Sequence, residues 1–279
     1  MRVALAVGLL GGLASAARLE IVQPALHQYE GGPALSGAAE FFPGDTVFLT
    51  FKVSGFTLVE KANEESLLLS YEIDALDPQG VRLQETATGK ISAVVRPEDK
   101  KAKWLPLVDY SVLVPPAAPP GDYRLAVSVK DLHGGAEARR EVTFRVRGRY
   151  VEPSDTLVVR NFRFYRSEVD TRPLEVPAYR PGDTLWARFD ITGYKLGPNN
   201  RFSIDYGLSV MSESGRLLYT QEVAAADERE SFYPERYTQG SLSLSLTPDL
   251  AKGTYTILLT VRDHLGNQTY QTRQAFHVD

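Results

Sequence analysis

The sequence of 279 residues contains no cysteine and only two methionines, two tryptophans and four histidines. Without thiols the chain forms no disulfide and has no thiolate nucleophile. Secreted animal domains are commonly held by disulfides, so their absence favours a bacterial periplasm or exterior. The fold must therefore be stabilised by core packing alone.

Long apolar runs are also missing, since a membrane-spanning helix needs about 20 apolar residues. The run from Val3 to Leu13 is too short, follows Arg2 and precedes the small residues Ala14-Ser15-Ala16. This order predicts a secretory signal peptide over residues 1–17. We expect the mature chain to be soluble, without a transmembrane segment, and secreted or periplasmic.

Positive charge is not in excess, because 31 basic residues face 35 acidic ones. Loss of Arg2 with the signal peptide widens this difference, so nucleic acid is not an expected partner. The apolar share of 43% and the charged share of 24% are typical of a globular chain. The length favours two domains.

A duplication organises the rest of the sequence. The turn Pro43-Gly44-Asp45 recurs as Pro181-Gly182-Asp183, at an offset of 138 residues (181 − 43 = 138). Each turn precedes an alternating apolar strand, and Pro-Gly suits a type II turn because glycine accepts the positive φ. The chain is thus predicted to contain two copies of one module.

Each copy contains about seven predicted strands separated by turns, and neither has a convincing helical stretch. This pattern predicts an all-β protein of two tandem immunoglobulin-like antiparallel β-sandwiches. The first covers residues 18–148 and the second residues 156–279. The linker, 149–155, is short and holds one proline, Pro153, which predicts a semi-rigid rod with limited hinging.

The motif Gly-x-Tyr opens a long alternating strand in both copies, at Tyr123 and Tyr255. This is the sequence form of a tyrosine corner, in which the phenol hydroxyl holds the backbone of an adjacent loop. An immunoglobulin domain would carry a cysteine two residues later. Leu125 and Ile257 occupy those positions, so apolar packing is expected to replace the disulfide.

The segment from Gly253 to Asn267 resembles the end of bacterial immunoglobulin-like modules, including the polycystic-kidney-disease type. The Pro-Gly-Asp strand opening is similar to that of macroglobulin-like domains of bacterial surface proteins. The resemblance implies a fold used for adhesion, spacing and docking, and it implies no specific activity.

Motifs for catalysis are absent, including a His-Glu-x-x-His zinc helix, a Gly-x-Ser-x-Gly elbow and a glycine-rich phosphate loop. His133 and His264 fall in turns, whereas His27 and His277 fall on or beside strands. We therefore predict no enzyme activity, no catalytic residue, no cofactor and no metal.

Four aspartates recur at turns in both copies, as Asp45 with Asp183 and Asp131 with Asp263. Calcium binding is one interpretation, because tandem sandwiches often hold this ion between domains. The other is that each carboxylate accepts hydrogen bonds from turn amides. The second is favoured because no Asp-x-Asp cluster lies near the linker.

Two aromatic residues, Phe48 and Trp186, occupy equivalent positions on the polar faces of their strands. A loop could cover them, they could line the contact between domains, or they could form a binding platform. Scattered exposed apolar residues are common and need no function, which favours the first two interpretations together.

Function specific to one copy should lie where the copies differ, on loops carried by the shared scaffold. Two such segments combine aromatic and basic residues, which are enriched at binding hot spots. The candidates are Lys103 and Trp104 in the first copy, and Phe232, Tyr233, Arg236 and Tyr237 in the second. For each segment a solvated loop is favoured over a contact site.

These observations predict a non-enzymatic secreted or periplasmic protein that binds another envelope or extracellular protein, or acts as a spacer. The alternative is a carbohydrate-binding accessory module with a polysaccharide partner. That alternative requires rings such as Trp104, Trp186 and Tyr233 to lie exposed on one open face.

Overall fold

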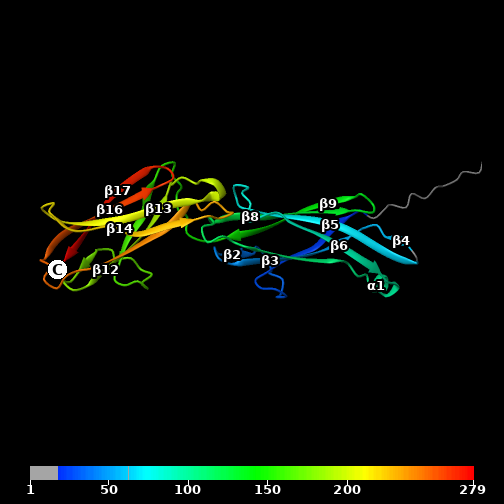
Figure 1. The fold of residues 1–279 in the computed structure, drawn as a ribbon. Helices are drawn as coiled ribbons and strands as arrows, with labels where there is room; N and C mark the ends of the chain where they lie inside the picture. Colours follow the sequence, from blue (N-terminus) through cyan, green and yellow to red (C-terminus); the bar gives the residue numbers. More distant parts are fainter. Residues whose placement is uncertain (1–17, 62) are drawn as a thin grey trace, which may run out of the picture.

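The computed structural model describes residues 18–61 and 63–279, so the predicted signal peptide over 1–17 lies outside the described residues. The chain is almost entirely β-structure and forms two sandwiches that lie end to end (Figure 1). No helix in the described ranges has the length and apolar character needed to cross a membrane.

In the first sandwich a three-stranded sheet (β1-β3-β7) faces a six-stranded sheet (β2-β9-β8-β5-β4, with β6 also paired to β5). Its elements are β1 (Glu20–His27), β2 (Glu40–Phe41), β3 (Thr46–Ser54), β4 (Val59–Lys61), β5 (Glu64–Leu76), β6 (Ala87–Val95), α1 (Pro97–Lys101), β7 (Leu107–Leu113), β8 (Gly121–Asp131) and β9 (Glu137–Val146).

The second sandwich repeats this plan with a three-stranded sheet (β10-β12-β15) and a five-stranded sheet (β11-β17-β16-β13-β14). Its elements are β10 (Val158–Tyr165), β11 (Ala178–Tyr179), β12 (Thr184–Thr192), the 3-10 helix η1 (Pro198–Asn200), β13 (Phe202–Ser212), β14 (Leu217–Arg229), β15 (Tyr237–Ser245), β16 (Gly253–Asp263) and β17 (Gln268–Val278). Pairings are antiparallel except for the short β2–β9 and β11–β17 contacts. The predicted all-β fold of antiparallel sandwiches is confirmed.

Alternating burial explains why these segments form strands. In β3, every second side chain points into the core, and the buried set is Val47, Leu49, Phe51 and Val53. The equivalent strand β12 buries Leu185, Ala187, Phe189 and Ile191. Each sandwich therefore encloses its own apolar core.

The repeated turns have the predicted geometry. Gly44 and Gly182 adopt φ values of +94° and +90°, which glycine accepts without steric cost. Asp45 closes its turn twice, since its amide donates to the Phe42 carbonyl oxygen at 3.0 Å and its Oδ2 accepts the Phe42 amide at 2.7 Å. The residue before each Pro-Gly-Asp is thereby held in a fixed position.

Both predicted tyrosine corners are present. The Tyr123 hydroxyl donates to the Pro119 carbonyl oxygen at 2.6 Å, and the Tyr255 hydroxyl donates to that of Ala251 at 2.6 Å. Leu125 and Ile257, at the positions of the missing cysteines, are fully buried. Apolar packing thus takes the place of a disulfide.

The segments in which the two copies lose sequence resemblance nevertheless contain equivalent strands. β6 pairs with β5, and β14 pairs with β13, each antiparallel. The copies differ after these strands, because α1 leads into β7 in the first copy, whereas an irregular loop leads into β15 in the second.

Candidate functional site

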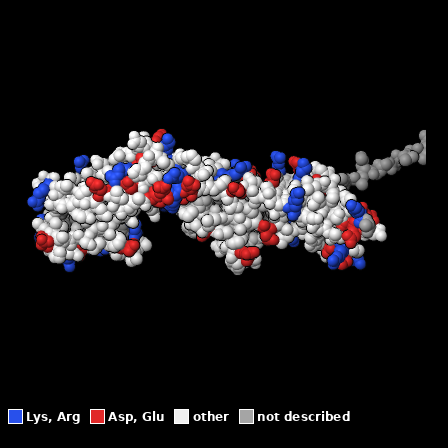
Figure 2. Space-filling model, in the orientation of Figure 1, with Lys and Arg blue, Asp and Glu red and all other residues white. Residues whose placement is uncertain are grey.

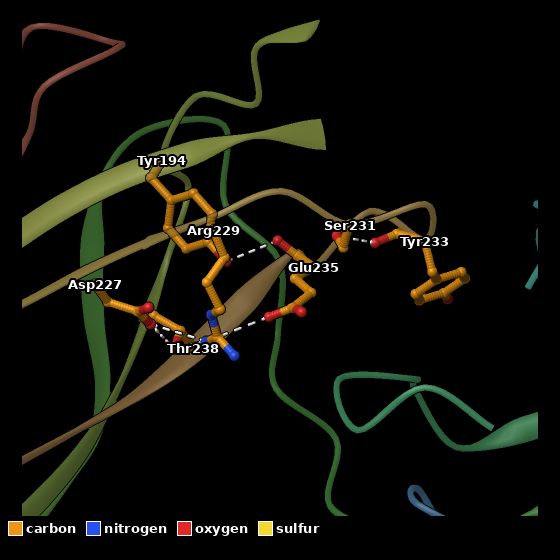
Figure 3. Close-up of polar contacts among 7 residues, drawn as sticks. All are labelled: Tyr194, Asp227, Arg229, Ser231, Tyr233, Glu235 and Thr238. Carbon is orange, nitrogen blue, oxygen red and sulfur yellow. Dashed lines mark hydrogen bonds and ion pairs between the residues drawn. The ribbon is translucent and has the colours of Figure 1, made fainter. Parts of the chain in front are cut away.

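The loop between β14 and β15, residues 230–236, lies where the two sandwiches meet, and we call it the junction loop. Side chains of the second sandwich hold its carbonyl groups, and Figure 3 shows one of them, the contact of Tyr194 with Glu235. Tyr194 donates to the Glu235 carbonyl oxygen at 2.7 Å, Thr192 to that of Arg236 at 2.8 Å, and Asn200 to that of Phe232 at 2.6 Å. The junction loop is therefore a rigid part of the second sandwich.

Tyr233 leaves this loop and enters the first sandwich. Its side chain is buried within the core of residues 19–146, and Figure 3 shows its ring pointing away from the rest of the group. The hydroxyl donates to Oδ2 of Asp77 at 2.8 Å, while Oδ1 accepts the amides of Gln79 and Val81 at 2.8 Å each. Burial, together with the hydrogen bond and negative charge of Asp77, raises the pKa of Tyr233 well above its ordinary value.

The linker is fixed to the second sandwich by an ion pair. The two Nη atoms of Arg149 contact the carboxylate oxygens of Asp190 at 2.7 and 2.5 Å. Asp190 is fully buried and also accepts the side-chain amide of Asn161 at 2.8 Å. Because Val151 is buried as well, the linker packs along the sandwich.

A second arginine cluster borders the junction loop. Nη2 of Arg229 contacts Oδ2 of Asp227 at 2.8 Å, Oγ1 of Thr238 at 3.0 Å and Oε2 of Glu235 at 3.3 Å (Figure 3). Its guanidinium also lies 5.3 Å from the centroid of the Phe202 ring. The cluster joins the edge strands β14 and β15 to the loop.

Between the sandwiches lies a groove of about 720 Å³, which we call the junction groove. The first sandwich supplies an apolar wall, and the linker and second sandwich supply a polar wall. The apolar wall contains Phe42, Pro43, Pro116 and Ala117, and the polar wall contains Arg149, Asp227, Arg229, Glu235, Tyr237, Thr238 and Gln239. Domain junctions of this kind are common places for ligand sites.

The candidates from the second copy separate into different environments. Tyr233 is buried in the other sandwich, and Tyr237 is half-buried in the junction groove. Phe232 and Arg236 are exposed on the junction loop. Tyr233 is thus a structural contact between sandwiches and presents no exposed ring to a partner.

The candidates from the first copy lie at the opposite end of the first sandwich. Lys103 and Trp104 follow α1, which Figure 1 places at the end distant from the second sandwich. Both are exposed, Trp104 by 41%. The structure therefore does not join them to the junction loop in one site.

Phe48 and Trp186 are both half-buried on three-stranded sheets, and neither lines the junction groove. Phe48 shares a small cleft of about 200 Å³ with Glu30 and Gly31 of the loop after β1. Trp186 stands between Tyr165 and Ser243 in the register of its sheet. Nothing in these positions therefore supports a domain contact for either residue.

The four repeated aspartates hold turns. Oδ1 of Asp131 accepts the amides of His133 and Gly134, and Oδ2 accepts that of Thr57 at 2.7 Å. Asp263 makes the equivalent contacts in the second copy, and Asp183 accepts the Arg180 amide at 2.8 Å. Burial alone would raise the pKa of Asp131, but the hydrogen bonds outweigh it and lower that pKa. Among residues 18–61 and 63–279, no acidic and histidine side chains group as metal ligands would.

Sequence reasoning missed most of the groove and its supports. Asp77 and Asp190 are single acidic residues without a motif, and their partners lie far away in the chain. The sequence did contain a sign that Phe42 is special to the first copy, because the equivalent residue of the second copy is Arg180 (180 − 42 = 138). The predicted candidates lie mostly in segments that the copies do not share, whereas Phe42 lies within the repeated turn.

Fold and junction together define a protein of two tandem antiparallel β-sandwiches locked end to end. No protein-family model and no curated protein matches the sequence.

Solved structures resemble it only weakly. One is a family 123 glycoside hydrolase from Clostridium perfringens (TM-score 0.31, 11% identity), where the match covers 44% of this chain and 27% of the hydrolase. A second is the C-terminal domain of the antigen I/II polypeptide BspA of Streptococcus agalactiae (TM-score 0.29, 10% identity, 93% and 99% covered). A third is α2-macroglobulin of E. coli (TM-score 0.29, 12% identity), of which this chain spans 17%. Similarity at this level assigns neither a family nor a function.

Proposed function

We propose that this chain is a non-enzymatic, secreted or periplasmic bacterial protein that binds another envelope or extracellular protein and acts as a rigid spacer. The burial of Tyr233 in the first sandwich carries the proposal. Tyr233 joins the second sandwich to the first, and the Arg149–Asp190 pair joins the linker to the second sandwich. A locked junction holds the two ends of the molecule at a fixed separation, which a spacer requires and a flexible linker does not provide.

The distant end of the first sandwich is the favoured contact surface. Trp104 is 41% exposed there, and Leu107, the first residue of β7, is 51% exposed. Lys103 adds a positive charge to the same segment. Tryptophan is among the residues most enriched at binding hot spots, and exposed apolar groups rimmed by charge are typical of protein interfaces.

The distribution of charge supports a protein partner over a polyanion. Figure 2 shows acidic and basic side chains interspersed over the visible face, without a broad region of one sign. Long-range attraction of nucleic acid or an anionic polymer needs such a region. A mixed surface is compatible with specific pairing across a protein interface.

The histidines support a structural role. His264 contacts Asp205 at 2.6 Å, but the same carboxylate also binds Arg262 at 2.7 Å. His27 bridges the Gly32 carbonyl and the Thr50 hydroxyl, and His277 contacts Thr254. Each of these three histidines thus serves a separate local contact, whereas catalysis requires several groups converging on one cavity.

The carbohydrate alternative, as the sequence suggested it, loses its geometric basis. It required Trp104, Trp186 and Tyr233 on one open face. Trp104 lies at the distant end of the first sandwich, Trp186 in β12 of the second, and Tyr233 is buried between them.

The test is capture from envelope extract of the source organism by immobilised residues 18–279, followed by mass spectrometry. We expect one dominant protein, and we expect Lys103→Ala with Trp104→Ala to reduce its retention. The control is Arg180→Ala, an exposed turn residue of the second sandwich. Retention of no protein, or equal retention by both variants, would contradict this proposal.

A further inference from the structure

The junction groove places an apolar wall opposite a polar one. Phe42 is 57% exposed on the apolar side, next to the ring of Pro43. Tyr237 and Gln239, two positions apart on β15, stand on the polar side. An occupant of this groove must therefore have one apolar face and a polar rim.

Phe42 is held in place before any ligand binds. Asp45 accepts its amide and donates to its carbonyl, which fixes the backbone at the start of the turn. The second copy builds the same turn with Arg180 at this position, where Asp183 accepts the Arg180 amide. The scaffold is shared, but only the turn beside the junction groove carries an aromatic ring, so the fold itself does not require phenylalanine there.

The charged groups of the groove are paired with one another. Arg149 is paired with Asp190, and Arg229 is paired with Asp227 and Glu235. Two guanidinium groups therefore face three carboxylates, and neither sign is in large excess. A strongly charged ligand would have to displace these pairs, whereas a neutral ligand can use the hydrogen-bonding positions that they leave open.

The polar wall also has hydrogen-bonding groups that the ion pairs do not use. The polar contacts of Arg229 with Asp227, Thr238 and Glu235 all use Nη2, so within the described part of the chain Nε and Nη1 are free to donate. Gln239 is exposed and offers both a donor and an acceptor. These groups are planar and lie on rigid strands or beside them.

We infer that the junction groove binds a neutral sugar. A pyranose ring has an apolar face of C–H groups, which fits against Phe42, and a rim of hydroxyl groups, which fits Arg229 and Gln239. Each sugar hydroxyl both donates and accepts, so it can pair with a guanidinium, a carboxylate or an amide. Of the binding candidates that the sequence suggested, only Tyr237 lines this groove. The site is independent of the protein contact at the distant end.

Other ligand classes fit less well. An anion would meet the carboxylates of Asp227 and Glu235. A proline-rich peptide also favours aromatic grooves, but the polar wall offers hydrogen-bonding groups along its length and little apolar surface for a second proline face. Such a peptide is kept as a competitor in the test.

The experiment is isothermal titration of residues 18–279 with neutral cello-, malto-, xylo- and chito-oligosaccharides and with a proline-rich peptide. We expect saturable binding of at least one sugar with little dependence on salt, because no net charge is neutralised. Phe42→Ala should weaken that binding by about tenfold through loss of ring contact. Gln239→Leu should also weaken it.

Arg180→Ala is the matched control, since it alters the same turn position away from the groove and should leave affinity unchanged. Thermal unfolding of each variant checks that the fold is intact. The inference is overturned if no sugar of the panel binds, if only the peptide binds, or if Phe42→Ala and Arg180→Ala bind sugar equally well. These results leave the protein-binding proposal untouched, because its variants lie at Lys103 and Trp104.

Discussion

The Tyr233 hydroxyl donates a 2.8 Å hydrogen bond to Asp77, a residue 156 positions away in the other sandwich. Asp77 is buried and already accepts two turn amides, so the phenol supplies the remaining partner of its carboxylate. The equivalent residue of the second copy is Ser212, whose hydroxyl holds its own turn. A carboxylate at this position is thus found only in the sandwich that receives the tyrosine.

Replacing Tyr233 should weaken the junction. In Tyr233→Phe, Asp77 loses its hydroxyl donor, and we expect a loss of about 1–3 kcal/mol in the free energy of unfolding. Tyr233→Ala also removes a buried ring, for which we expect about 3–5 kcal/mol. Chemical denaturation measures both losses.

Small-angle X-ray scattering of Tyr233→Ala adds a test of shape. A released junction should broaden the distribution of interatomic distances, because the linker alone then connects the sandwiches. Phe232→Ala is the control, since its exposed neighbouring ring should affect neither measurement. If Tyr233→Ala matches the wild type in both denaturation and scattering, Tyr233 does not hold the two sandwiches together.

Asp131 should contribute stability that depends on pH in the acidic range. Its pKa is lowered in the folded state from the ordinary 3.8, because amides of Gly134, Thr57 and His133 stabilise the carboxylate. A lowered pKa adds stability above the unfolded value, and that stability is lost as pH falls through the folded value. We expect Asp131→Asn to lower the melting temperature at neutral pH.

The difference between wild type and Asp131→Asn should shrink as the solution is acidified below about pH 4. Thermal melts from neutral to acidic pH measure it. A difference that stays constant across this range would mean that Asp131 acts through packing and not through its charge.

Local patterns predicted much of the fold and little of the site. Alternation, the Pro-Gly-Asp turn and Gly-x-Tyr depend on neighbouring residues, so strands such as β3 and β12 and both tyrosine corners could be read from the chain. The junction depends on contacts between distant residues. Tyr233 looked like a surface aromatic because nothing near it in sequence reveals its partner Asp77, and Phe42 lay within a turn already explained by the fold.

Buried tyrosines should make the protein lose stability in alkaline solution. Burial raises the pKa of Tyr110 to about 12 and that of Tyr179 to about 12, from the ordinary 10.0. A raised pKa contributes stability that is complete below the unfolded value and is lost as pH rises through the folded value. We expect stability to decline between about pH 10 and 12.

Tyrosinate absorbance followed together with circular dichroism tests this expectation. Part of the tyrosinate absorbance should appear only when the fold is lost. Tyr179→Phe should reduce the alkaline loss of stability, although the substitution also removes the hydrogen bond from the Tyr179 hydroxyl to the Tyr165 carbonyl oxygen. Complete ionisation of all 14 tyrosines in a still folded protein would contradict it.

Arg147, at the end of the first sandwich, and Arg149, at the start of the linker, should differ greatly in their effect on stability. In the described part of the chain, Arg149→Met leaves the fully buried Asp190 with Asn161 as its remaining side-chain donor. Breaking a fully buried pair costs about 3–5 kcal/mol, and we expect about 2–3 kcal/mol here because the Arg149 side chain is 45% exposed. Arg147 pairs with Glu40 on the surface, so Arg147→Met should change stability by about 1 kcal/mol or less.

A double variant separates charge burial from packing. Asp190→Leu combined with Arg149→Met removes both charges, and we expect it to be more stable than Arg149→Met alone because no unpaired carboxylate stays buried. Urea denaturation of the two single variants, the double variant and the Arg147→Met control measures these differences. If Arg149→Met and Arg147→Met lose equally little stability, solvent reaches Asp190 once Arg149 is gone, and the Arg149–Asp190 pair does not stabilise the junction.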